Sequence, residues 1–189
     1  HHSYYNLGLV NTKLNRKKDA ISSFRKAIEY KTDDFSSNLN LGVMLLKKGE
    51  FEESKKYSQI ALTLNNYSFE ALFNLGLIEL YQNDFKSAIT YFKRSLINQP
   101  NNYKIHRYLG IAQFLGDDDE AIENLEKSIL LSPKINLSTV LSNVIKTKII
   151  NKKNGKIINN NFQNFINTEP IILRRKVEAE LLDFIYKRN

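Results

Sequence analysis

Three asparagines stand 34 residues apart and carry a side chain that is well suited to binding a peptide backbone. Asn6, Asn40 and Asn74 each precede a Leu-Gly pair. An amide offers both a donor and an acceptor, so it can pair with the backbone of an extended ligand whatever side chains that ligand has. Asparagine is also a mediocre helix former, so its recurrence in a helical pattern needs a reason. We expect either a ladder of amides that holds a ligand or amides that bond to a neighbouring helix.

The residue types that usually catalyse reactions or bind metals are present, but their spacing matches neither a catalytic motif nor a metal-binding motif. Residues 117–120 read Asp-Asp-Asp-Glu, without the alternation and the glycine of a calcium loop, and are expected to cap the helix that follows. Gly155-Lys156 lacks the glycine-rich lead of a phosphate-binding loop. His106 has no nucleophile suggested beside it, and the chain has no cysteine. We expect no catalytic residue, no metal site and no cofactor, although an enzyme could be attached upstream.

The same 34-residue step organises most of the chain into pairs of helices. The Leu-Gly pair recurs at 7–8, 41–42, 75–76 and 109–110. Around each pair, apolar residues follow at helical spacing, and a short polar turn leads to a second amphipathic stretch. The expected helices cover 2–14 and 17–31, 35–48 and 51–64, 69–82 and 85–98, and 103–115 and 118–131. The sequence therefore predicts an all-α protein.

The recurring glycine points to close packing inside each pair. A glycine in a helix costs about 1 kcal/mol relative to alanine, so its repetition needs a compensating gain. We expect the glycine to let the second helix approach at its small residues, which are Ala20, Ala88 and Ala121. The leucines expected to fill the space beside this contact are Leu7, Leu41, Leu75 and Leu109. One pair cannot bury its apolar face alone, so neighbouring pairs must stack.

The pattern resembles the tetratricopeptide repeat, which has Leu-Gly in its first helix and an alanine, an aromatic residue and a terminal proline in its second. The third unit matches best, through Leu75, Gly76, Phe85, Ala88, Phe92 and Pro100. The second unit departs at Ser54 and Ser58, and the fourth has a shorter internal turn. The units are 1–34, 35–68, 69–102 and 103–134. The resemblance implies a right-handed superhelical array of four helix pairs, whose first helices line a concave groove that binds an extended or helical protein segment.

The resemblance also indicates which residues face this groove. Beside the three asparagines, they are Tyr5, Leu9, Leu39, Val43, Phe73, Leu77, Arg107 and Ile111. Most are apolar, and contiguous exposed apolar surface usually marks an interaction site. The alternative is that several lie deeper between the helices. Some family members clamp a terminal carboxylate with lysine and arginine, but most of those cations are missing here.

The C-terminal part differs from the repeats in its charge. The net charge is +8, and residues 134–189 hold 11 basic residues against 4 acidic ones. Residues 135–150 are expected to form a capping helix on the array. A second amphipathic helix, 170–187, could pack on the cap, fill the groove of its own chain or dock on a partner, and a second copy of the chain is another candidate partner. The alternative ligand is a nucleic acid or an anionic membrane, bound through 146–156 and 174–176 with a steep salt dependence.

These features favour a non-catalytic scaffold or adaptor that binds another protein, and the alternative is a regulatory domain of a larger enzyme. No apolar run approaches the roughly 18–20 residues of a membrane span. No signal peptide is visible, and the cytoplasm is favoured as the compartment. The chain does not begin with Met, so we expect a fragment or a processed form in which His1 and His2 are left over from a tag.

Overall fold

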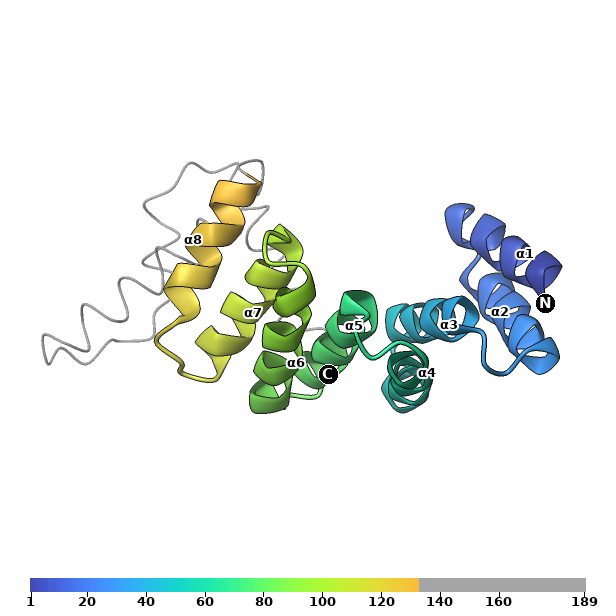
Figure 1. Cartoon of the computed structure of the whole chain (residues 1–189), viewed down its shortest axis with the longest axis horizontal. Coiled ribbons are helices and arrows are strands. Elements are labelled where there is room, and N and C mark those ends of the chain that lie inside the picture. The colour runs from blue at the N-terminus through green and yellow to red at the C-terminus, as the bar shows by residue number, and fades with distance from the viewer. Residues whose placement is uncertain (133–189) are drawn as a thin grey trace, which may run out of the picture.

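The computed structural model describes residues 1–132, and these residues form helices without any strand (Figure 1). The helices are α1 (His2–Lys13), α2 (Lys17–Tyr30), α3 (Phe35–Lys48), α4 (Phe51–Leu64), α5 (Phe69–Tyr81), α6 (Phe85–Asn98), α7 (Tyr103–Leu115) and α8 (Ala121–Leu131). They follow one another as four pairs, with α1 and α2 at one end of the row and α7 and α8 at the other. The all-α array of helix pairs is confirmed. The helices expected in 135–150 and 170–187 lie outside the described residues.

Four helices begin at a side-chain cap, in which an oxygen accepts a hydrogen bond from a backbone N–H of the first turn. The caps are Asp34, Ser68, Asp84 and Asn102. The expected start of α8 at residue 118 is wrong, because α8 begins at Ala121. Asp117 adopts a positive φ of 56°, and the Asp118 carboxylate accepts the N–H of Glu120. The acidic run thus forms the turn before α8 and not its first turn.

Replacing Asp84 by alanine is expected to lower the free energy of unfolding by about 1 kcal/mol, the usual contribution of an N-cap. The carboxylate accepts the Ser87 N–H at 3.0 Å and the Ser87 hydroxyl at 2.7 Å, and these bonds hold the pKa of Asp84 below its ordinary 3.8. The charged form is therefore favoured in the folded state. Its contribution is fully present above pH 3.8 and is lost as the pH falls through the lower folded value. Urea unfolding at neutral and acid pH should show the Asp84→Ala difference shrinking in acid, and a constant difference would contradict the ionic part of the cap.

In three of the four described units, the helical glycine makes room chiefly for a large side chain of the second helix and not for the alanine that the sequence suggested. A Cβ added to Gly76 would lie 2.6 Å from Cε1 of Phe92. Gly8 meets Phe24 in the same way. Each of these rings lies one turn beyond the expected alanine, because a helical side chain points back over the turn that precedes it. In the first and third units the close approach of the two helices is therefore made by glycine and an aromatic ring, whereas Gly110 meets Leu125 and Gly42 meets Ser58.

Each of the apolar cores in the described residues crosses a boundary between units. One joins α2 to α3 and includes Phe24, Leu41 and Leu45. A second joins α4 to α5 through residues such as Leu62 and Leu75. The third extends from α5 to α8. Each pair of helices thus depends on its neighbour for burial, as expected for a repeat array.

The leucine that precedes each glycine packs on the unit before it. Leu41, Leu75 and Leu109 are almost fully buried. Leu7, expected to fill a similar space, is 48% exposed. Leu7 lies in the first of the described units, and none of the other described helices covers it.

Candidate protein-binding groove

A hollow of about 960 Å³ opens between α3, α5 and α7. We call it the groove, and its lining residues are Val43, Leu46, Lys47, Lys48, Gly49, Phe51, Phe69, Glu70, Phe73, Asn74, Leu77, Tyr81, Asn102, Lys104 and Ile105. It runs from the last turns of α3, across the length of α5, to the first turn of α7. First helices line most of it because the repeat places equivalent residues, such as Val43 and Leu77, next to one another. Its volume lies within the range of about 300–1,000 Å³ that is common for binding pockets.

The floor of the groove is apolar and is held from behind by the core. Phe73 and Leu77 project from α5 and pack against the core that runs from α5 to α8. The ring centroid of Phe73 lies 5.6 Å from those of both Phe92 and Tyr108. Val43 is half-buried and is not among the side chains that pack on the three cores of residues 1–132. The floor residues of α5 are therefore supported by the core, and Val43 contributes chiefly to the groove surface.

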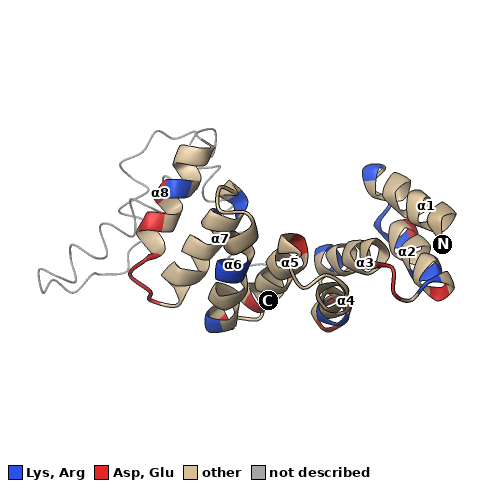
Figure 2. Cartoon of the chain, viewed as in Figure 1, with Lys and Arg blue, Asp and Glu red and all other residues tan. Residues whose placement is uncertain are grey.

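Charge in the groove is mostly positive and lies at its ends. Lys47 and Lys48 stand in the last turn of α3, and Lys104 in the first turn of α7. The one acid among the lining residues is Glu70, which accepts the Ser68 hydroxyl at 3.0 Å. Figure 2 shows the long stretches of α5 and α7 that carry neither sign of charge. The groove thus combines an apolar centre with cationic ends.

The three asparagines of the 34-residue ladder occupy three different environments. Asn6 is exposed on α1. The Asn40 amide donates to the Ser36 carbonyl of its own helix at 2.8 Å. Asn74 is only 3% exposed, and its amide donates to the Ser58 hydroxyl at 2.5 Å. The contact between Asn74 and Ser58 is the bond to a neighbouring helix that was expected as the alternative to a ligand ladder. Ser58 stands where the first and third units have an aromatic residue.

The other sequence-predicted groove residues divide between the groove and the cores. Val43, Phe73 and Leu77 line the groove together with Asn74. Several others lie outside it and belong to cores or to their edges: Tyr5, Leu9, Leu39 and Ile111. Ile111 is only 6% exposed, since α7 is covered there by its neighbours. The Arg107 guanidinium lies 5.0 Å from the centre of the Tyr108 ring.

Sequence reasoning missed the groove residues in the last turn of the first helices. Lys47 and Tyr81 lie four residues beyond Val43 and Leu77, so they continue the same helical stripe. Tyr81 stacks on Phe51 with ring centroids 5.8 Å apart. Extending the stripe by one turn would have found Lys47 and Tyr81. Phe51 opens a second helix, and no pattern in the first helices indicates it.

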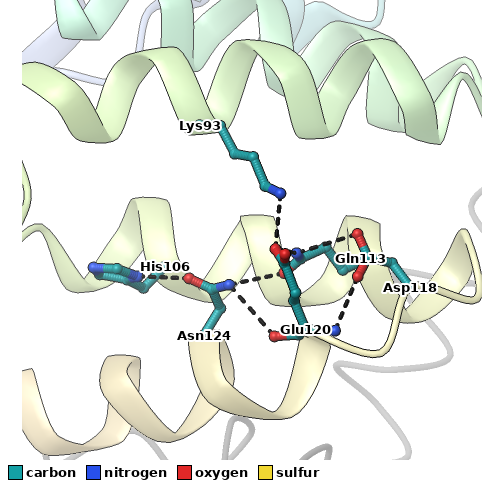
Figure 3. Close-up of polar contacts among 6 residues, drawn as sticks. All are labelled: Lys93, His106, Gln113, Asp118, Glu120 and Asn124. Carbon is teal, nitrogen blue, oxygen red and sulfur yellow. Dashed lines mark hydrogen bonds and ion pairs between the residues drawn. The ribbon is translucent and has the colours of Figure 1, made fainter.

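A chain of polar contacts outside the groove joins α6, α7 and α8 (Figure 3). The Gln113 amide nitrogen donates to the carboxylates of Asp118 and Glu120, at 3.3 and 3.0 Å. Lys93 lies 2.7 Å from the Glu120 carboxylate. The side-chain oxygen of Gln113 accepts a hydrogen bond from the Asn124 amide nitrogen at 2.9 Å. The acidic run therefore fixes the orientation of the buried Gln113 amide and, through it, of the half-buried Asn124 amide.

The same chain of contacts ends at His106, the histidine considered above for acid–base chemistry. Its Nδ1 lies 2.8 Å from the side-chain oxygen of Asn124, and its Nε2 lies 2.8 Å from the Pro100 carbonyl. The ring is buried and both nitrogens are engaged within the protein. His106 thus holds α7 to α8 and to the loop before α7.

Within residues 1–132, no cluster of histidine, cysteine and acidic residues has the composition of a metal site. None of the helices in this part of the chain is both long enough and apolar enough to cross a membrane.

Comparison with known families identifies the repeat. Two family models, both described as tetratricopeptide repeat, match residues 69–102 and residues 1–34, 35–67 and 106–135. These matches cover more than half of the chain, so the protein belongs to the tetratricopeptide repeat family. Repeats of this family form scaffolds for protein–protein interaction, and that is the general role that family and fold support here. Among curated protein sequences, none matches significantly.

Solved structures with the same fold include several of MamA. MamA 41-end from Desulfovibrio magneticus RS-1 has a TM-score of 0.74 at 15% identity, over 95% of each chain. MamA AMB-1 has a TM-score of 0.69 at 20% identity, over 77% of this chain and 87% of that one. Cut9–Hcn1, an APC/C hetero-tetramer, gives 0.70 at 19% identity, over 75% of this chain and 29% of that one. Identities this low establish the shared superhelical fold and nothing about ligands.

Proposed function

We propose that this protein is a non-catalytic scaffold that holds a segment of another protein in the groove between α3, α5 and α7. The observation that carries the proposal is the apolar floor formed by Val43, Phe73 and Leu77. Apolar surface of this kind in a concave site usually marks a binding surface. The polar and charged residues at its ends supply the rim that protein interfaces commonly have.

The apolar floor, and not the asparagine ladder, is the main source of affinity in this proposal. The Asn74 amide nitrogen is already bonded to Ser58, and the Asn40 nitrogen to the Ser36 carbonyl. Asn6 is exposed and remains a candidate for pairing with a ligand backbone. The proposed occupant is a segment of a different protein, and residues 170–187 of this chain or a second copy are the alternative occupants. The basic segments 146–156 and 174–176, considered for nucleic acid or membrane binding, lie outside the described residues and add no support to that alternative.

A selection from a library of short random peptides displayed on phage would test the proposal on the full chain. We expect peptides that bind the natural protein but not Val43→Asp, with affinity lowered roughly ten- to a hundredfold by the variant, because a carboxylate would be placed on the apolar floor. Val43 suits the test because it packs on none of the described cores, so the fold should be kept.

The matched control is Ile97→Asp, which places the same charge at a highly exposed position of α6, outside the groove. Circular dichroism melting would confirm that both variants are folded. Equal loss of peptide binding in the two variants, or full retention in Val43→Asp, would contradict binding in the groove. Light scattering tests whether the occupant is a second copy of the chain. In that case the natural protein should be a dimer and Val43→Asp a monomer.

A further inference from the structure

Given the groove binding proposed above, we infer that the bound segment carries acidic residues on both sides of an apolar stretch. Neither the family nor the fold specifies this chemistry. It follows from where charge lies on the helices that line the groove.

The first helices are almost free of acidic residues. The segments α1, α3 and α7 contain none. Helix α5 contains Glu70 and Glu79, and Glu79 is buried with its carboxylate 2.8 Å from the Lys55 amine of α4. The charge of Glu79 is thus balanced inside the array. Glu70, which accepts the Ser68 hydroxyl, is left as the one acid facing three lysines in the groove.

Two of these lysines are unpaired and stand at opposite ends of the apolar floor. Lys47 lies in the last turn of α3 and Lys104 in the first turn of α7, and both are exposed. Neither amine is in an ion pair within residues 1–132. The third, Lys48, lies beside Glu50 and is paired with it. Within the described part of the chain, the groove therefore offers one unpaired cation at each end.

Lys104 stands where helix electrostatics disfavour a cation. The N-terminus of a helix is its positive end, so a lysine in the first turn is repelled by the aligned peptide dipoles. No acid in that turn compensates for it. The Lys104 amine lies 5.9 Å from the centre of the Tyr103 ring, a contact at the edge of the cation–π range. Lys104 is thus poorly explained by the stability of α7 and well explained by an anionic partner.

A complementary partner would place apolar side chains on Val43, Phe73 and Leu77 and a carboxylate near each of Lys47 and Lys104. Opposite charges at the rim of an interface raise the association rate and fix the register of the bound segment. The acids would lie within the segment, which distinguishes this arrangement from capture of a terminal carboxylate.

The test uses the peptides selected by the full chain and a charge-reversed variant, Lys47→Glu with Lys104→Glu. Peptides that depend on Val43 should be enriched in aspartate and glutamate on both sides of their apolar residues. We expect the reversed variant to bind them about tenfold more weakly, a difference that shrinks at high salt. It should itself select peptides rich in lysine and arginine. The matched control is Lys18→Glu with Lys31→Glu, which changes the net charge equally outside the groove and should leave the peptide affinities unchanged.

The outcomes separate the inference from the proposed function. Peptides that depend on Val43 but show no acidic enrichment, or that bind the reversed variant unchanged, would overturn the inference and leave groove binding standing. A lower melting temperature of the reversed variant with unchanged affinities would assign the lysines to helix stability and would also overturn it. Failure to select any peptide that depends on Val43 would overturn the proposed function itself.

Discussion

Replacing Phe92 by alanine is expected to lower the free energy of unfolding by about 3–5 kcal/mol, the usual cost of emptying a large buried aromatic site. Phe92 is fully buried, and its ring fills the space that Gly76 leaves open in the first helix of the same unit. It also supports the ring of Phe73 from behind. Urea denaturation of the full chain measures the change, and Lys86→Ala, on the exposed side of the same helix, should change stability by less than about 0.5 kcal/mol.

The contact between Gly76 and Phe92 predicts that the effect of Gly76→Ala on stability changes sign when Phe92 is removed. In the natural protein, Gly76→Ala should destabilise by about 1–3 kcal/mol, because the new methyl would lie 2.6 Å from the Phe92 ring. In the Phe92→Ala background that clash is gone, so the substitution should stabilise by about 1 kcal/mol through helix propensity. A double-mutant cycle gives the coupling directly. If the two changes are additive, the glycine does not serve to accommodate the ring.

The second large effect concerns the ion pair between Lys55 and Glu79. Lys55→Met should destabilise by about 1–3 kcal/mol, because it leaves the Glu79 carboxylate buried without its partner. The hydrogen bond to Glu79 raises the pKa of Lys55 above its ordinary 10.5. The contribution of the pair is therefore fully present below pH 10.5 and is lost as the pH rises through the higher folded value. Urea unfolding at neutral pH gives the main comparison.

The double variant Lys55→Met with Glu79→Leu supplies the control. A buried pair replaced as a whole by apolar residues usually costs little, so the double variant should regain most of the loss. A double variant as unstable as Lys55→Met alone would mean that the effect comes from the packing of the lysine stem and not from the stranded charge.

The helix pairs could be predicted from the sequence because their signals are local and repeated. The Leu-Gly pairs, the helical spacing of apolar residues and the polar turns recur every 34 residues, so an error in one unit is corrected by the other three. The start of α8 could not be placed, because an acidic run such as 117–120 fits both a first helical turn and the turn before it. The contacts of this acidic run depend on Gln113 and Asn124, and these residues come close to it only when the two helices of the fourth unit pack together.

The groove was only partly predictable, because depth is not encoded in helical register. Val43 and Ile111 share one register position, yet Val43 lines the groove and Ile111 lies in the core. The difference comes from how closely the neighbouring units pack at each place. Asn74 shows the same limit, because its partner Ser58 belongs to the preceding unit. The sequence shows that Ser58 replaces an aromatic residue, but it does not show that the Asn74 amide bonds to the serine hydroxyl.

The contact between the two helices of the second unit has a mechanical consequence. Elsewhere the glycine of a first helix is pressed against Phe24, Phe92 or Leu125, whereas Gly42 faces the hydroxyl of Ser58 and the amide of Asn74. Water can replace hydrogen bonds of this kind but cannot replace the contact of a buried ring. Because each unit contacts only its neighbours, an array pulled from its two ends yields one joint at a time. The second unit, whose helices meet through Gly42 and Ser58, should open before the others, so the array would extend first next to the groove proposed to hold the ligand.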